Sequence, residues 1–270
     1  MSLTLVSDRH HMSLAAIPSS KGVEAAIRRA STTTGVDFDF LMKTARRESG
    51  FNPDAKARSS SASGLFQFIE QTWLSTLKQH GAKHGYGQYA DLIYQGNDGR
   101  WQVRGSARNV VLDLRFDAQA ASAMAGELTA SNAAYLRGRT GREPNGGDLY
   151  AAHFLGPAGA AKMIEAMQSR PNSSAASIFP EAAAANRSIF YKQGRPATVA
   201  EVYANLQSTA GGATLVLTGG GQGASSPQYS EQDLALAARL DRLKQDQGLL
   251  SLLLNQGDGG HFKGAFSDSV

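Results

Sequence analysis

The stretch "RRESGFNPDAKARSSSASGLFQF", residues 46–68, decides the fold. It joins a helix that ends near Glu48 to a "GLFQF" segment through a polar, serine-rich loop. Apolar residues at helical spacing predict that the helix covers residues 37–49, with Asp37 as its N-cap. Gly50 can take the left-handed conformation that commonly closes a helix. The stretch therefore predicts a glutamate in the last turn of a helix, next to a polar loop.

The rest of the chain carries further helical patterns and no convincing strand alternation. Helices are predicted over residues 22–31 and 69–79, and an alanine-rich pattern follows over 109–139. Residues 147–167 predict a helix, a Gly-Pro break and another helix. Residues 80–108 are polar and punctuated by glycine, so a loop-rich insertion is expected there, with a short helix at "ADLIY" as an alternative. The fold class is therefore predicted to be mainly α.

Composition divides the chain into a main domain and appendages. The expected parts are a flexible N-terminal tail (1–20), the main domain (21–207), a Gly/Ser-rich linker (208–230), an amphipathic helix (231–254) and a disordered tail (255–270). Two interpretations of the predicted leucine-rich helix are equally compatible with the sequence. It either docks on the main domain or binds a partner protein as a tethered helix.

Charge and composition exclude several classes of function. The net charge of +4 is not accompanied by a basic run or a basic-aromatic stripe, so no nucleic-acid partner is expected. The chain has no cysteine, which excludes disulfides and thiol chemistry. No stretch is long and apolar enough to span a bilayer, and no signal-peptide core can be drawn in residues 1–20. His80 and His84 have a metal-compatible spacing, but Gly81 lies between them and no third ligand is evident, so solvent-exposed histidines and no metal are expected.

Glu48 is the strongest catalytic candidate. At 3.6 residues per turn it shares a stripe with Leu41 and Ala45, away from the basic residues of its helix. A carboxyl group against apolar neighbours is disfavoured in its charged form, so its pKa is expected to rise toward neutrality, as a general acid requires. The structural alternative is that Glu48 pairs with Arg46, with Arg47 or with a backbone amide at the start of a neighbouring helix.

The ordered set around Glu48 favours the catalytic interpretation. Glu48-Ser49, "FNPDA", the serine loop, "GLFQF" and a helix with Thr72-Trp73 together resemble the signature of the soluble lytic transglycosylases, relatives of goose-type lysozyme. Phe66 stands where that family has methionine. The resemblance covers about residues 22–205 and implies a lysozyme-like fold.

A second segment resembles the family more weakly. "YAAHFLGPAGA", residues 150–160, falls where the family shows Ala-Ala-Tyr-Asn-x-Gly, so His153 replaces the tyrosine and Phe154 the asparagine. The family's tyrosine is thought to form hydrogen bonds near the catalytic glutamate. An imidazole can donate similarly, with its own titration near neutral pH; a structural histidine is equally compatible. The departure resembles a divergent branch, similar to α-proteobacterial transglycosylases, some of them associated with flagellar assembly.

The resemblance implies cleavage of the bond between N-acetylmuramic acid and N-acetylglucosamine, with an anhydromuramoyl product and no cofactor. Glu48 would act alone as acid and then base. Ser49 would orient the glutamate or a substrate amide, and Gln67 would bind sugar oxygens. Phe66 is expected as cleft floor or core. Tyr150 is expected either to line the cleft or to make an interior helix contact.

Two alternatives remain beside the transglycosylase. A muramidase would admit water and give a reducing end, and a non-catalytic wall-binding or assembly protein would act through residues 231–254. The substrate, a peptidoglycan glycan strand, implies a periplasmic location, although the sequence shows no export route. Service to a flagellum or secretion apparatus is an expectation from the resemblance alone.

Overall fold

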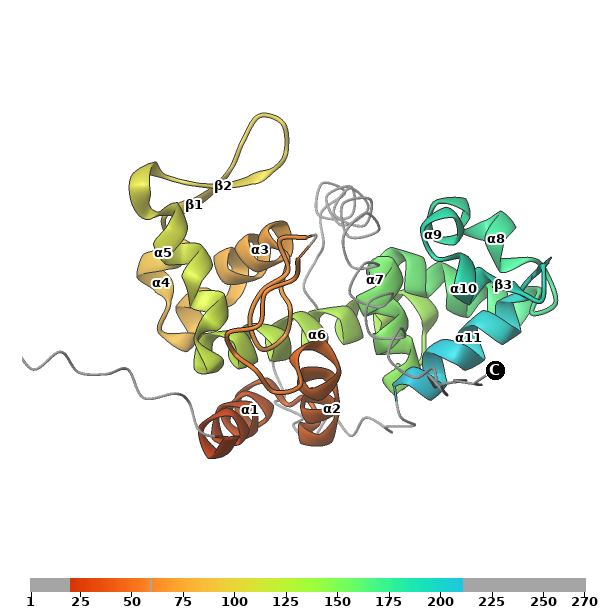
Figure 1. The fold of residues 1–270 in the computed structure, drawn as a ribbon, viewed down its shortest axis with the longest axis horizontal. Helices are drawn as coiled ribbons and strands as arrows, with labels where there is room; N and C mark the ends of the chain where they lie inside the picture. The colour runs from red at the N-terminus through yellow and green to blue at the C-terminus, as the bar shows by residue number, and fades with distance from the viewer. Residues whose placement is uncertain (1–19, 59, 211–270) are drawn as a thin grey trace, which may run out of the picture.

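A computed structural model describes residues 20–58 and 60–210, and in this part of the chain the fold is mainly helical (Figure 1). The prediction of a mainly α protein is confirmed. The predicted tails and the helix at 231–254 lie outside the described residues, as does nearly all of the linker. The helices are α1 (Ser20–Thr34), α2 (Phe38–Ser49), α3 (Glu70–His80), α4 (Gly87–Ala90), α5 (Arg108–Asp113), α6 (Ala118–Thr140), α7 (Gly146–Ser169), α8 (Ala175–Ile178), α9 (Pro180–Ala185), α10 (Arg187–Phe190) and α11 (Val199–Thr209).

Helix α6 runs through the middle of the molecule and contacts α1, α2, α3 and α7 (Figure 1). Its buried positions are mostly small, including Ala120, Ala121 and Ala125, so neighbouring helices approach its backbone closely. Most of its circumference is buried, which explains the alanine-rich pattern without a clear polar stripe. The helix therefore forms the core against which the elements on both sides are placed.

Helix α7 is a single element with a kink. Gly156 has φ 72° and ψ 166°, outside the helical region, and Pro157 follows it. The predicted Gly-Pro break is thus confirmed as a bend. The first turn of α7 is fixed by Asp148, which is fully buried and accepts hydrogen bonds from Arg142 (2.8 Å) and from the Tyr203 hydroxyl on α11 (2.6 Å). This anchoring sets the position of the half-helix before the bend.

Residues 80–108 contain more regular structure than their polar, glycine-rich pattern indicates. The 3₁₀ turn η1 (Gly81–His84) and α4 precede an antiparallel hairpin of β1 (Ile93–Gln95) and β2 (Trp101–Val103), followed by the turn η2 (Gly105–Ala107). The Gln71 side chain of α3 both donates to and accepts from the Trp101 backbone, at 3.0 and 2.8 Å. Three-residue strands are too short to show alternation in sequence, which is why no strand was expected.

Two small elements complete the fold. The 3₁₀ turn η3 (Leu114–Phe116) links α5 to α6, and a two-residue hairpin of β3 (Tyr191–Lys192) and β4 (Arg195–Pro196) precedes α11. Helix α11 packs along α7. Its C-terminal end lies near α2, where the Thr209 backbone carbonyl accepts a hydrogen bond from Arg47. Segments from the start and the end of the described chain therefore meet around α7.

Candidate active site

Helix α2 carries Glu48 to its C-terminal end as predicted. The Asp37 carboxylate accepts from the Phe40 amide at 2.8 Å, which caps the first turn, and Gly50 closes the helix with φ 61°. Leu41 and Ala45 are fully buried on the same stripe. The Glu48 side chain keeps 11% of its surface exposed, so its carboxylate sits at the boundary between core and solvent.

Ser49 fastens α2 to the segment that follows the serine loop. Its hydroxyl faces two backbone carbonyls, those of Leu65 at 2.8 Å and Ala45 at 3.2 Å. A hydroxyl has one proton to donate, and here the backbone receives it. The structure therefore places Ser49 as a link between the helix end and "GLFQF", while its predicted contact with a substrate amide stays a prediction.

Gln67 is part of the same scaffold. Its backbone has a positive φ of 48°, and its side-chain nitrogen donates to the carbonyls of Gly64 (2.9 Å) and Ala55 (3.2 Å). The Gln67 Nε2 atom thus binds backbone carbonyls of its own loop. The side-chain oxygen is the group left to bind a sugar. Phe66 is only 5% exposed and packs in the hydrophobic core, so of its two predicted roles the structure favours the core.

Gly64 stands where the loop touches the segment before α6. Its φ is +79°, and a Cβ atom there would lie 1.8 Å from the Arg115 carbonyl oxygen. The Arg115 side chain is itself buried and donates to the backbone oxygens of Ser61, Phe68 and Leu112. Burial lowers the pKa of Arg115. The serine loop is thus a closed structure pinned by an arginine from another element, and the sequence pattern gave no signal of it.

The opposite side of Glu48 is formed by α7. The His153 Nε2 atom lies 3.4 Å from Glu48 Oε1, and the imidazole is 43% exposed. The His153 ring stacks on Tyr150, with centroids 6.1 Å apart and planes 19° apart. Tyr150 is 2% exposed, which agrees with the expected interior helix contact. Its buried hydroxyl has no hydrogen-bond partner within the described residues.

Arg47 is the neighbour that the helical projection missed. Its Nε atom lies 3.4 Å from Glu48 Oε1, and its guanidinium covers the Tyr150 ring at 4.3 Å from the centroid. It also donates to the Thr209 carbonyl of α11 at 3.3 Å. A helical projection shows only the direction in which each side chain leaves the helix. The long side chain of Arg47 extends across the helix end and so reaches Glu48. The alternative that Glu48 pairs with an adjacent arginine is therefore present in the structure, together with the histidine contact.

The pKa of Glu48 departs from the expectation in direction. Burial is the largest influence and raises the pKa, but electrostatic attraction to His153 and to Arg47, with the hydrogen bonds that both make, outweighs it. The net result is a pKa below the ordinary 4.5, so the predicted rise is wrong. Burial raises the pKa of Tyr150 to about 12, with Glu48 adding to the rise and Arg47 opposing it.

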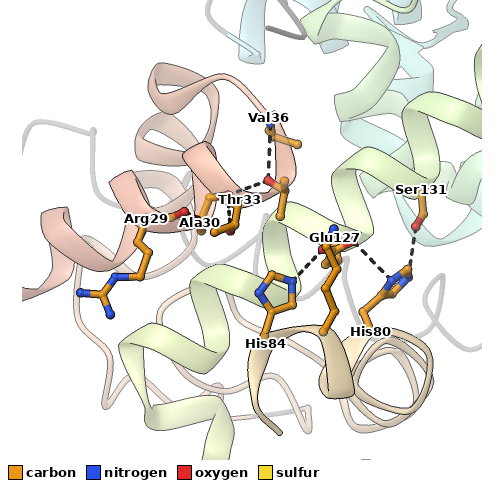
Figure 2. Close-up of polar contacts among 10 residues, drawn as sticks. Arg29, Ala30, Thr33, Val36, His80, His84, Glu127 and Ser131 are labelled. Carbon is orange, nitrogen blue, oxygen red and sulfur yellow. Dashed lines mark hydrogen bonds and ion pairs between the residues drawn. The ribbon is translucent and has the colours of Figure 1, made fainter. Parts of the chain in front are cut away.

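A second polar cluster lies between α6 and the end of α3 (Figure 2). Glu127 of α6 is 5% exposed and contacts His80 at 3.3 Å, Lys83 at 2.7 Å and His84 at 2.7 Å. His84 is only 9% exposed, so the expectation of solvent-exposed histidines is wrong. The three basic side chains converge because a buried carboxylate needs partners. Among the described residues, no group of side chains is arranged to hold a metal ion.

Fold and site together define a mainly helical, lysozyme-like domain with one carboxyl group at the end of a helix. Residues 25–92 match the family model of the Transglycosylase SLT domain, whose members are lytic transglycosylases that act on peptidoglycan. This match covers α1 to α4, well under half of the chain, and it includes Glu48, Ser49, Phe66 and Gln67. Tyr150 and His153 lie beyond it. Within the described residues, no helix is both long and apolar enough to cross a bilayer.

Proposed function

We propose that this protein is a peptidoglycan lytic transglycosylase that cleaves the β-1,4 bond between N-acetylmuramic acid and N-acetylglucosamine. The observation that carries the proposal is the placement of Glu48. Inside the matched segment, a partly exposed carboxyl group ends a rigid helix and is locked through Ser49 to the "GLFQF" backbone. A glycosidase acid needs such fixed placement at the boundary of the core.

A single carboxyl group suffices for this reaction. Most glycosidases need a second carboxylate as nucleophile or base. Asp54 is exposed on the loop, and Glu70 is engaged with Arg108 at 2.5 Å, so neither has the setting of Glu48. The 2-acetamido group of the muramic sugar can assist from within the substrate, as in the substrate-assisted exceptions to the two-carboxylate rule. Glu48 then protonates the leaving oxygen and afterwards accepts the proton of the 6-hydroxyl, which closes the anhydro ring.

Mass spectrometry of peptidoglycan digests tests the proposal. The unsubstituted chain is expected to release anhydromuropeptides, and Glu48→Gln, which keeps the shape and removes the titrating proton, is expected to release none. Circular dichroism of both chains provides the folding control. Equal product release by the two chains would remove Glu48 from the mechanism. Reducing muropeptides in place of anhydro products would assign the chain to the hydrolytic muramidases.

One observation favours a non-catalytic alternative. Glu48 is held as a carboxylate by Arg47 and His153, and His153-Phe154 stands where the resemblance expects tyrosine and asparagine. A protein that keeps the fold as a platform for wall binding would tolerate both features. A pull-down with insoluble peptidoglycan distinguishes catalysis from wall binding alone. If both the unsubstituted chain and Glu48→Gln bind peptidoglycan and neither turns it over, the result supports the non-catalytic alternative.

The finer assignments form part of the same proposal. The substrate places the protein in the periplasm, and a divergent branch that opens the wall for a flagellum or secretion apparatus accounts for the departures at residues 153 and 154. Residues 231–254 would supply the contact with such a machine, through the linker at 208–230. These assignments rest on the resemblance and on sequence composition.

A further inference from the structure

We propose that His153 holds, on its Nε2 atom, the proton that Glu48 delivers to the glycosidic oxygen. The proposal rests on the proposed function and concerns how the same site is supplied with its proton. His153 acts through Glu48, so it is a positioning and proton-holding residue and does not itself touch the scissile bond.

The need for such a partner follows from the state of Glu48. A general acid must carry a proton when the substrate binds. In this structure Oε1 of Glu48 faces nitrogen atoms of two basic side chains, Arg47 Nε and His153 Nε2, each at 3.4 Å. These contacts favour the ionised carboxylate, and they lower the pKa of Glu48 in spite of its burial. A neighbouring group that carries a proton near neutral pH and lies in contact with Oε1 would supply the proton that cleavage requires.

Arg47, Tyr150 and His153 interact with Glu48 in the described structure, and they differ in what they can donate. Arg47, on the same helix, stays protonated at any working pH and cannot supply a proton. Tyr150 on α7 has its pKa raised to about 12, so its hydroxyl keeps its proton near neutrality. The remaining neighbour is His153, and an imidazole is the side chain that ordinarily gains and loses a proton near neutral pH.

The geometry around His153 suits a proton carrier. Stacking on Tyr150 fixes the plane of the ring, and α11 holds Arg47 in place through the Thr209 carbonyl. The imidazole is 43% exposed, so water can return a proton to it after each turnover. The separation of 3.4 Å from Glu48 exceeds a good hydrogen bond by roughly 0.5 Å, and catalytic hydrogen bonds often tighten only when substrate binds.

Substrate binding would move the proton. A glycan strand over the site excludes water, and exclusion of water favours the neutral carboxylic acid and neutral imidazole over the ion pair. The proton passes from His153 Nε2 to Glu48 Oε1 and then to the leaving oxygen, which keeps the electron pair of the broken C1–O4 bond. As the 6-oxygen bonds to C1, its proton returns to Glu48 and then to His153. The cycle consumes no water and leaves the pair as it began.

The test compares pH-rate profiles of anhydromuropeptide release. An ordinary carboxyl group titrates about two pH units below an ordinary imidazole. With His153→Gln, Glu48 must hold the proton itself as a buried carboxyl group beside Arg47, so the alkaline limb of kcat is expected to move to lower pH by up to about two units. At neutral pH kcat is expected to fall by roughly 100-fold, with little change in KM. His153→Tyr keeps a ring and a donor but does not titrate near neutrality, so it should show the same acid shift.

His80→Gln, which removes a histidine in the Glu127 cluster, is the matched control and should keep the profile of the unsubstituted chain. An unchanged alkaline limb in His153→Gln, or full rescue by His153→Tyr, would overturn the proposal. ¹⁵N NMR of the unsubstituted chain avoids any folding defect of the variants. The His153 ring should be doubly protonated at the pH of maximal turnover, and a neutral ring there would also overturn it. If Glu48→Gln keeps its activity, the proposed function itself fails; if it is inactive and His153→Gln keeps the normal profile, only this inference fails.

Discussion

Glu48 shows how a distant neighbour reverses an effect that local sequence predicts. Burial against Leu41 and Ala45 does raise its pKa, as the helical pattern indicates. His153 and Arg47 then contribute opposite and larger effects, and the net shift is downward. One of these groups comes from a helix far along the chain, so no reading of α2 alone could have given the direction. Two basic side chains beside the Glu48 carboxyl group favour its ionised form, so its action as an acid depends on where its proton comes from.

The lowered pKa of Glu48 predicts a pH dependence of stability. A carboxyl group whose folded-state pKa lies below its unfolded value stabilises the fold above the unfolded value, near 4.5, and this contribution is lost as pH falls through the folded pKa. Relative to Glu48→Gln, the unsubstituted chain should therefore lose free energy of unfolding on acidification. Urea denaturation of both chains at neutral and acid pH measures the difference. In a His153→Gln background the acid loss should shrink, because His153 is the largest lowering influence, and an equal loss in both backgrounds would contradict the contact.

At the scale of elements, the described residues of the serine loop are held by backbone bridges and by an arginine from another element. Backbone bridges pair Ser63 with Lys56 and Phe68, and Arg115 binds the loop carbonyls from inside. The sequence showed only that the loop is polar and ends in Gly64. The function of that glycine depends on the approach of another segment, which a single sequence does not display.

Alanine substitutions at Gly50 and Gly64, at the two ends of this loop, distinguish the cost of backbone strain from the cost of a steric clash. Gly50→Ala meets nothing within 4 Å, so it should cost only the left-handed backbone conformation, about 1 kcal/mol. Gly64→Ala adds a clash with the Arg115 carbonyl and should cost on the order of 3 kcal/mol. Chemical denaturation gives both values, and turnover should fall further in Gly64→Ala because the "GLFQF" backbone must move. Equal costs at the two positions would mean that the loop yields freely to Arg115.

At the scale of the whole molecule, short-range signals were predictable and long-range contacts were not. The bounds of α2, its Asp37 cap and its Gly50 end follow from local rules, and so does the bend at Gly156. The β1–β2 hairpin escaped prediction because its strands are short and are held by a glutamine of α3. The pairing of α2 with α7 and α11 around Glu48 depends on the packing of α6 and α7, which spacing in sequence does not encode.

The described residues predict a self-sufficient catalytic unit. The ion pairs and hydrogen bonds that hold Glu48, Arg47 and His153 in place join partners within residues 20–210, and so do the hydrogen bonds that close the serine loop. A chain that lacks residues 211–270 should therefore keep its thermal midpoint within about 4 °C, the shift that roughly 1 kcal/mol produces in a domain of this size. It should also release the same anhydromuropeptides from purified peptidoglycan.

A loss of turnover without a loss of stability would show that residues 211–270 contribute to the site, against this expectation. A finer deletion of residues 231–254 then addresses the predicted partner-binding helix. Because the contacts described for Glu48 join residues 20–210, this deletion should leave turnover on purified peptidoglycan intact, and under the proposed partner role it should abolish recruitment by a partner protein. If localisation and every pull-down partner survive the deletion, the proposal that residues 231–254 bind a partner fails, and recruitment depends on another part of the chain.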